Sequence, residues 1–273
     1  MKSLIRLCAV TLVALISLGV AQGDVLARDL HLATTTSTDN SGLLDFLLPK
    51  FESKTGIAVR VISVGTGKAI KLGENGDVDV ILVHSRPDED RFVAQGYGVN
   101  RRDVMYNDFV IVGPENDPAG LRGMRDPVAA FNKIWNAKAA FVSRGDESGT
   151  NKMEMRYWKQ ANENPTDNPG YRAAGRGMGA VLLMASELGA YTLTDRATFY
   201  AMQNKLDLKI LVEGDPRLFN PYGVIAVNPQ KHPGVNYQDA MRFIDWLTSS
   251  EGQQVIGDFK VGGKQLFFPD AKQ

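Results

Sequence analysis

The sequence is poor in the residues that most often build disulfide frameworks and metal sites. Its 273 residues include one cysteine, Cys8, so neither a disulfide nor a cysteine-based zinc site can form within the chain. The three histidines, His31, His84 and His232, are far apart and lack the spacing of a zinc-binding helix. We therefore expect no disulfide scaffold, no bound metal and no other cofactor.

Neither sign of charge is in excess, since Lys plus Arg total 31 and Asp plus Glu total 31. A nucleic-acid-binding domain usually carries basic residues in excess, so this balance argues against a nucleic-acid partner. Hydrophobic residues make up 44% of the chain and charged residues 23%, an ordinary globular mixture that excludes a disordered, collagen-like or coiled-coil chain. The length suits two domains or one large domain.

The chain has one long apolar run, at residues 7–20, and it follows Lys2 and Arg6. The run is short for a membrane-spanning helix, and small residues come after it, as in a secretory signal peptide. We predict that residues 1–23 are such a signal; cleavage after Ala27 and an uncleaved membrane anchor are the alternatives. Export would remove the one cysteine and leave a slightly acidic protein, which fits a bacterial periplasm.

Strand-like and helix-like segments alternate along the rest of the chain. Strands are expected at residues 30–35, 58–64, 78–83, 108–112, 139–142, 191–193, 208–212 and 222–228. Helices are expected from 41–42 to 56, with Pro49 kinking or ending the regular part, and at 68–72, 86–95, 128–135, 153–161, 178–188, 195–204, 239–249 and 251–259. Strand–helix–strand units of this length predict parallel strands and an α/β fold.

Three of the predicted strand-to-helix turns are rich in glycine, serine and threonine. Residues 34–41 are mostly Thr and Ser, residues 65–67 read Gly-Thr-Gly, and residues 143–150 include Arg144 and end in Ser-Gly-Thr. Backbone N–H groups at a helix start favour an anion, hydroxyl groups add donors, and a guanidinium suits an oxyanion. The alternatives are ordinary helix capping and a surface ion pair between Arg144 and a nearby carboxylate.

The three turns can converge on one site, because ligands of open α/β sheets bind at the carboxyl ends of the strands. Residues 34–67 and 143–150 are expected in different lobes, which places the site in a cleft between the lobes. No catalytic base accompanies the turns, so we predict a binding protein and not an enzyme. An enzyme on the same scaffold and a sensing subunit that docks on a receptor are the alternatives.

Several segments resemble the tungstate-binding proteins of ABC importers. The most specific are the Thr-rich run at residues 34–38 and the segment 143–150, which reads Ser-Arg-Gly-Asp-Glu-Ser-Gly-Thr. Further matching segments are residues 64–67, 75–80, 106–114, 177–180, 191–196 and 243–249. The resemblance implies a periplasmic binding-protein fold, in which two α/β lobes joined by a hinge close over one tetrahedral oxyanion. It also implies delivery of the anion to a membrane permease that a cytoplasmic ATPase drives.

With this fold we predict that residues 24–112 form the first part of lobe 1, residues 113–213 form lobe 2, and residues 214–273 return to lobe 1. A monomer is expected. The resemblance and the donor chemistry together predict that the ligand-binding residues are Thr35, Thr36, Ser37, Thr66, Gly67, Arg144, Ser148, Gly149 and Thr150.

The identity of the anion is a separate question. Tungstate and molybdate are fully deprotonated at neutral pH and only accept hydrogen bonds, whereas monohydrogen phosphate also carries a proton and benefits from a carboxylate acceptor. Asp146 could be that acceptor, or it could pair with Arg144 and orient it. The resemblance favours tungstate, sequence alone does not separate tungstate from molybdate, and a phosphate-binding protein is the alternative.

Overall fold

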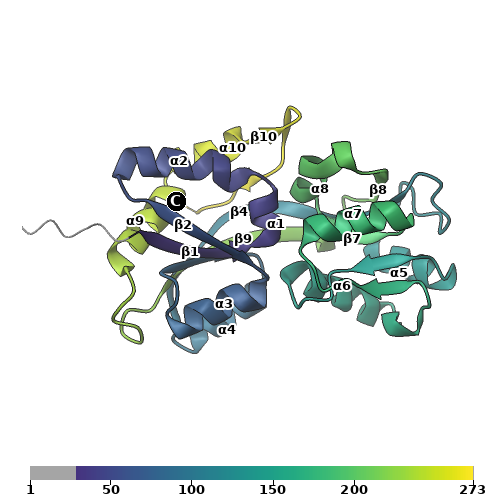
Figure 1. Cartoon of the computed structure of the whole chain (residues 1–273), viewed down its shortest axis with the longest axis horizontal. Coiled ribbons are helices and arrows are strands. Elements are labelled where there is room, and N and C mark those ends of the chain that lie inside the picture. Colours follow the sequence, from purple (N-terminus) through teal and green to yellow (C-terminus); the bar gives the residue numbers. More distant parts are fainter. Residues whose placement is uncertain (1–28, 273) are drawn as a thin grey trace, which may run out of the picture.

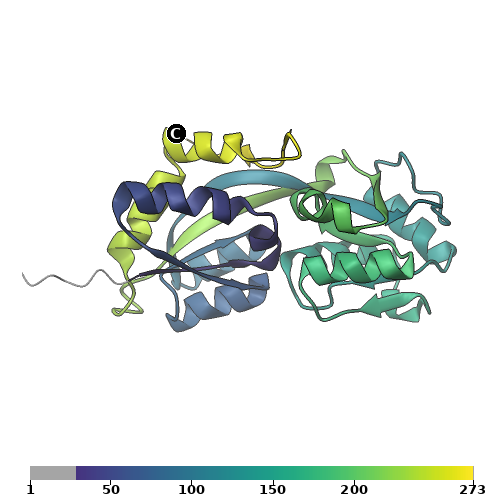
Figure 2. The ribbon, with the colours of Figure 1, turned by 45° about the horizontal axis from the view of Figure 1, so that its top comes forward.

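Two long strands, β4 (Gly98–Pro114) and β9 (Phe219–Val227), connect two α/β lobes in the computed structural model of the protein. Figure 2 shows both strands running from one lobe into the other. The first part of β4 pairs with β9, and its last part, from Phe109 on, pairs with β7 (Thr192–Asp195) and β8 (Leu208–Val212). One strand therefore belongs to the sheets of both lobes.

The structure describes residues 29–272, so the predicted signal peptide at residues 1–23 lies outside the described part. Within residues 29–272, no helix is both long enough and apolar enough to cross a membrane. The predicted lobe limit between residues 112 and 113 falls inside β4, and the limit between residues 213 and 214 falls in the segment between β8 and β9. These limits stay a prediction.

The sheet of lobe 1 is built on β1 (Leu30–Thr35), which lies between β2 (Val59–Val64) and β3 (Val80–Val83). These three strands are parallel, as the sequence predicts. β9 is antiparallel to both β3 and β4, and here the parallel prediction is wrong. The reason is that β4 carries the chain out of lobe 1 and β9 carries it back.

Helices cover both faces of the lobe 1 sheet (Figure 1). On one face lie α2 (Leu43–Thr55), α9 (Tyr237–Leu247) and α10 (Ser250–Asp258), whose apolar side chains form one core with the sheet. On the other face lie α3 (Thr66–Asn75) and α4 (Arg86–Ala94). Each buried Leu or Phe of these cores contributes about 1.5–3 kcal/mol.

Lobe 2 has its own cores. Its further elements are α5 (Pro127–Asn136), β5 (Phe141–Ser143), α6 (Gly149–Gln160), β6 (Tyr171–Ala173), α7 (Met178–Leu188) and α8 (Arg196–Met202). Trp158 lies at the centre of one core, edge-on to Phe131 and Phe141. The chain closes on lobe 1 with the short strands β10 (Lys260–Val261), β11 (Lys264–Gln265) and β12 (Phe268–Pro269). Three short 3₁₀ turns lie at Pro165–Asp167, Gln203–Lys205 and Pro216–Leu218.

The helix starts at the predicted turns differ from the sequence prediction. A short helix, α1 (Thr36–Asn40), precedes α2, because Thr35 caps it by accepting a hydrogen bond from the backbone N–H of Thr38. α2 also continues past Pro49, although proline lacks an N–H, since the apolar face around it stays buried.

The helices at the other two turns begin earlier than predicted. α3 starts at Thr66 and not at residue 68, and α6 starts at Gly149 and not at residue 153. The Gly, Ser and Thr residues that the sequence places in loops therefore form the first turns of helices.

Candidate functional site

The three turns meet at the junction of the two lobes. β1 and β2 are parallel and in register up to Thr35 and Val64, so the turns that follow them leave the same edge of the lobe 1 sheet. From lobe 2, the turn after β5 reaches this edge and touches both of them. The convergence that the sequence predicts is therefore present in the structure.

Arg144 makes the first contact between the lobes. Its Nη2 atom donates a hydrogen bond to Thr36 Oγ1 at 3.1 Å. The arginine is only 2% exposed, so its charge lies inside the protein. A buried guanidinium has to be neutralised by an anion or a carboxylate, because an unpaired buried charge is costly. Gly177, at the start of α7, makes room for the contact, since a Cβ atom there would come within 3.3 Å of Thr36 Oγ1.

Thr66 and Gly149 make the second contact. The backbone N–H of Gly149, the first residue of α6, donates to Thr66 Oγ1 at 3.1 Å. Both residues are buried, and a Cβ atom on Gly149 would approach Thr66 Oγ1 to 3.3 Å. Gly67 lies beside them, with its Cβ direction 3.9 Å from the carbonyl oxygen of Glu147. The first turns of α3 and α6 thus face each other.

Two of the predicted binding side chains have capping roles. Thr35 caps α1, and Ser148 Oγ accepts from the backbone N–H of Asn151 at the start of α6. The capping alternative that the sequence left open therefore describes these two hydroxyl groups. Both are also almost fully buried.

Asp146 pairs with Arg144. Its Oδ2 atom accepts from Arg144 Nη2 at 2.6 Å, and its Oδ1 atom accepts from the backbone N–H of Ser148 at 3.2 Å. Each carboxylate oxygen thus already has a donor within its own loop. This arrangement fits an aspartate that orients the arginine.

Two buried polar atoms at the site have no hydrogen-bond partner within the described part of the chain. They are Arg144 Nε and Thr150 Oγ1. A buried donor without a partner costs about 1–3 kcal/mol. Both atoms belong to the turn that carries the predicted anion-binding residues, so the site has donors to offer a ligand.

His84 is a site residue that the sequence analysis missed. It follows β3 directly, and its Nε2 atom lies 3.3 Å from Ser37 Oγ while its Nδ1 atom lies 2.9 Å from Asn220 Oδ1. Burial, and to a smaller extent the charge of Arg144, lowers the pKa of His84 to about 4. One signal was available, because β3 ends at the same edge as β1 and β2. Asn220 lies on the crossing strand β9, and nothing in its local sequence marks it.

Glu154 stabilises the turn after β5 through buried hydrogen bonds. Its carboxylate accepts hydrogen bonds from Ser143 Oγ at 2.6 Å, from Trp158 Nε1 at 3.0 Å and from the Tyr171 hydroxyl at 3.2 Å. Ser143 Oγ in turn accepts from the backbone N–H of Gly145 at 3.2 Å. Burial raises the pKa of Glu154 to about 7, although these donors oppose the shift.

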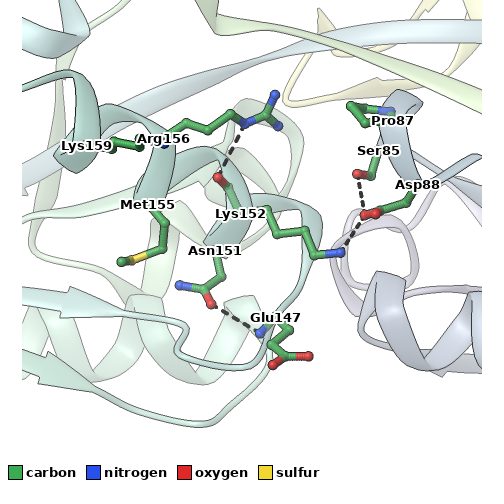
Figure 3. Close-up of a pocket in the computed structure, with 9 residues that line it drawn as sticks. All are labelled: Ser85, Pro87, Asp88, Glu147, Asn151, Lys152, Met155, Arg156 and Lys159. Carbon is green, nitrogen blue, oxygen red and sulfur yellow. Dashed lines mark hydrogen bonds and ion pairs between the residues drawn. The ribbon is translucent and has the colours of Figure 1, made fainter. Parts of the chain in front are cut away.

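A second group of residues joins the lobes outside the site. Lys152 on α6 donates to Asp88 Oδ2 on α4 at 2.5 Å, and Ser85 and Arg91 hold the same carboxylate from its own lobe. Figure 3 shows this pair at one side of a hollow of about 480 Å³, with Met155 on its α6 side. The ion pair requires the two lobes to lie close together.

The site holds no cluster suited to a metal ion. Among residues 29–272, no three His, Cys, Asp or Glu side chains are grouped so that they could ligate one. The chemistry on offer is hydrogen-bond donation by hydroxyl groups, by backbone N–H groups at helix starts and by one buried guanidinium. These are the donors that proteins use for oxyanions.

Comparison with known proteins places the chain in a family. A family profile described as a PBP superfamily domain matches residues 23–251. The tungstate-binding protein TupA of Peptoclostridium acidaminophilum is 50% identical over 244 residues, covering 88% of this chain and 85% of that protein. TupA of Campylobacter jejuni is 41% identical over 240 residues, covering 86% of this chain and 89% of that protein.

Solved structures agree. The tungstate ABC transporter structure from Geobacter sulfurreducens has a TM-score of 0.79 at 54% identity, covering 85% of this chain and 99% of that one. TupA from Desulfovibrio alaskensis has a TM-score of 0.76 at 50% identity, covering 90% of this chain and all of that one. The two-lobed fold, the shared sequence and the family profile lead to one conclusion: the chain belongs to the PBP superfamily and, within it, to the family of tungstate-binding proteins of ABC transporters.

Proposed function

We propose that this protein binds a fully deprotonated tetrahedral oxyanion, tungstate in the first place and molybdate as the close analogue, in the cleft between its lobes. The observation that carries the proposal is the contact between Arg144 of lobe 2 and Thr36 of lobe 1. A guanidinium and a hydroxyl that meet across a cleft can both turn to an anion placed between them. The names of the relatives support tungstate as the ligand.

In this proposal each turn has a part in binding. Thr35, Thr36 and Ser37 offer hydroxyl or backbone donors from lobe 1, and Thr66 and Gly67 close the pocket beside them. Arg144 supplies the charge-assisted bond from lobe 2. At the start of α6, Thr150 offers its hydroxyl group and the helix offers the positive end of its dipole, while the backbone N–H groups of Ser148 and Gly149 hold this turn in place through Asp146 and Thr66.

The geometry also favours a fully deprotonated anion over phosphate. Monohydrogen phosphate needs an acceptor for its proton, and Asp146 was the candidate acceptor. Its two oxygens already accept from Arg144 and from the backbone of Ser148. In this role Asp146 aims the guanidinium, and the protein captures its ligand without transforming it.

We further infer the setting in which the protein acts. Relatives include a putative ABC transporter anion-binding protein from Haloferax volcanii, 54% identical over 258 residues, covering 93% of this chain and 75% of that protein. By this analogy the chain hands the anion to a membrane permease. Our proposal also includes export to the periplasm, where the substrate-binding proteins of ABC importers act, and a monomeric state. Stimulation of the ATPase of its reconstituted importer by the loaded protein, and not by the empty protein, would support this role.

Calorimetric titration tests the ligand. The protein is titrated separately with tungstate, molybdate, sulfate and phosphate at one pH and ionic strength. The proposal expects tight binding of tungstate and molybdate, one anion per chain, with sulfate and phosphate far weaker. Tight phosphate binding without a response to tungstate would overturn it.

A further inference from the structure

His84 lies where both lobes and the connecting strand β9 meet. The residue is only 6% exposed, and the centroid of its ring lies 4.8 Å from that of the Tyr222 ring on β9. A Cβ atom on Gly149 of lobe 2 would come within 3.1 Å of His84 Cε1, so α6 packs directly against the ring. On the lobe 1 side the ring contacts Ser37. A change in the charge of the ring therefore changes the electrostatic potential in the cleft between the lobes.

The hydrogen bonds around His84 fix its tautomer. Asn220 Nδ2 donates to Asn107 Oδ1 at 2.7 Å, which leaves Asn220 Oδ1 facing His84 Nδ1 at 2.9 Å. A carbonyl oxygen only accepts, so the proton of the neutral ring lies on Nδ1. Nε2 then carries a lone pair that can accept from Ser37 Oγ, and Thr35 Oγ1, which lies 3.0 Å from Ser37 Oγ, can donate to the serine oxygen in turn. In this arrangement the Ser37 hydroxyl proton is directed away from the cleft.

Binding of a dianion changes the charge around His84. Arg144 is already neutralised by Asp146, so the ligand brings two further negative charges into a buried site. A proton added at His84 Nε2 would supply a compensating positive charge. It would also convert Ser37 Oγ from the donor into the acceptor of the shared hydrogen bond, and the serine would regain its proton for the anion.

We propose, on the basis of the function proposed above, that His84 is a proton-coupled positioning residue: capture of the dianion is accompanied by uptake of one proton at Nε2, which turns the Ser37 hydroxyl toward the ligand. In the empty protein the ring is neutral, because burial lowers the pKa of His84 to about 4. The bound anion raises that pKa, since an opposite charge favours the charged form.

Other charged and titratable groups near the ring also influence the protonation of His84. Arg144 opposes protonation of His84. Asp146 and Asp195 lie near Arg144 and offset it, and burial raises the pKa of Asp195 to about 6. Tyr222 stays neutral, because burial raises its pKa well above the usual value. Asp195 is thus the competing site of proton uptake, and the experiment has to separate it from His84.

The test is calorimetric titration with sodium tungstate at about pH 7.5 in buffers that differ in ionisation enthalpy. The slope of binding enthalpy against ionisation enthalpy counts the protons taken up. We expect about one proton per anion, with affinity falling about tenfold for each unit of pH above neutrality. Tight binding without proton uptake overturns the inference, whereas no binding of tungstate at all overturns the proposed function instead.

Variants locate the proton. His84→Gln is expected to lose the uptake, while Asp195→Asn and the remote control His232→Gln keep it; uptake that persists in folded His84→Gln overturns the inference. The side-chain ¹⁵N spectrum of the unaltered protein decides the matter even if that variant fails to fold. Tungstate should convert the His84 signals from the neutral to the doubly protonated form, and signals that stay neutral would rule the proposal out.

Discussion

Arg144 and Thr36 touch across the two lobes, although 108 positions separate them in the sequence, with Arg144 Nη2 3.1 Å from Thr36 Oγ1. The contact joins the turn after β5 to the start of α1. It is possible only while the lobes lie together, so it reports the closed arrangement. A ligand that bridges the same two residues stabilises this arrangement over an open one.

Removal of the guanidinium should weaken anion binding. Arg144→Ala loses a charge-assisted hydrogen bond in a buried site, and we expect a loss of about 1.5–3 kcal/mol or more in binding free energy for tungstate. Calorimetry measures the change. Arg217→Ala, which removes an exposed arginine paired with Asp215, is the matched control and should bind as the unaltered protein does. Unchanged affinity in Arg144→Ala would remove this residue from the site.

The glycine at the start of α6 should be needed for closure. In Gly149→Ala the new methyl group would lie 3.1 Å from His84 Cε1 and 3.3 Å from Thr66 Oγ1, so these lobe 1 side chains and the start of α6 have to move apart by a few tenths of an ångström. Overpacking of this kind costs about 1–3 kcal/mol, and tungstate affinity should fall accordingly. Gly234→Ala is the control, since no other atom of residues 29–272 beyond its chain neighbours lies within 4 Å of its added methyl group. Equal affinities in the two variants would contradict the packing argument.

The ion pair between Lys152 and Asp88 should contribute modestly to the closed arrangement. Lys152→Met keeps the length of the side chain but loses the charge, and because the pair is partly exposed we expect a loss of about 0.5–1 kcal/mol in anion affinity. Lys159→Met, on the same exposed helix face, removes a lysine that lines the hollow without such a pair in the described structure. Equal losses of affinity in the two variants would show that the Lys152–Asp88 ion pair does not stabilise the closed arrangement.

Glu154 should shape the anion-binding turn without touching the ligand. Its carboxylate is acceptor to three donors, so Glu154→Gln replaces one acceptor oxygen by a donor and disrupts the bond from Ser143. The disruption should cost about 1–3 kcal/mol in the free energy of unfolding. Tungstate affinity should fall as well, because Ser143 holds the backbone next to Arg144. Thermal and chemical unfolding, with the exposed Glu187→Gln as control, measure the first effect.

The raised pKa of Glu154 predicts that the stability of the protein depends on pH. Burial raises the pKa of Glu154 to about 7, and burial also raises the pKa of Glu89 to about 7, against about 4.3 for an unfolded glutamate. The folded protein therefore binds protons more strongly than the unfolded chain between these values. Its free energy of unfolding should decline as the pH rises from about 4.5 to about 7, and level off above. Denaturant titration across this range checks the sign, and a rise would contradict it.

The sequence was sufficient to predict which turns meet, because that prediction rests on a general property of α/β sheets. The carboxyl ends of neighbouring strands share one edge, and the residues after β1 and β2 are rich in hydroxyl groups and glycine. Arg144 was also identified from the sequence, because a guanidinium at a strand-to-helix turn suits an oxyanion; the ion pair with Asp146 that the sequence left open is present as well. The family resemblance added the fold and the ligand class.

Other parts of the site depend on tertiary packing that no local pattern records. Asn220 reaches His84 because β9 crosses between the lobes beside β3, and the register of that pairing decides which side chain faces the ring. The sequence prediction omits α1 and starts α3 and α6 too late, because it rests on apolar periodicity and these helix starts are polar. Capping side chains such as Thr35 are the physical reason that these polar turns are helical.

A crystal structure of the protein with tungstate shows where the anion binds, since tungsten is located by its anomalous scattering. We expect one tungsten peak per chain, between the lobes, with the anion's oxygens within hydrogen-bond distance of Arg144, of the start of α1 and of the start of α6. A peak in the hollow beside Lys152, or at any other place away from the three turns, would contradict the proposed site.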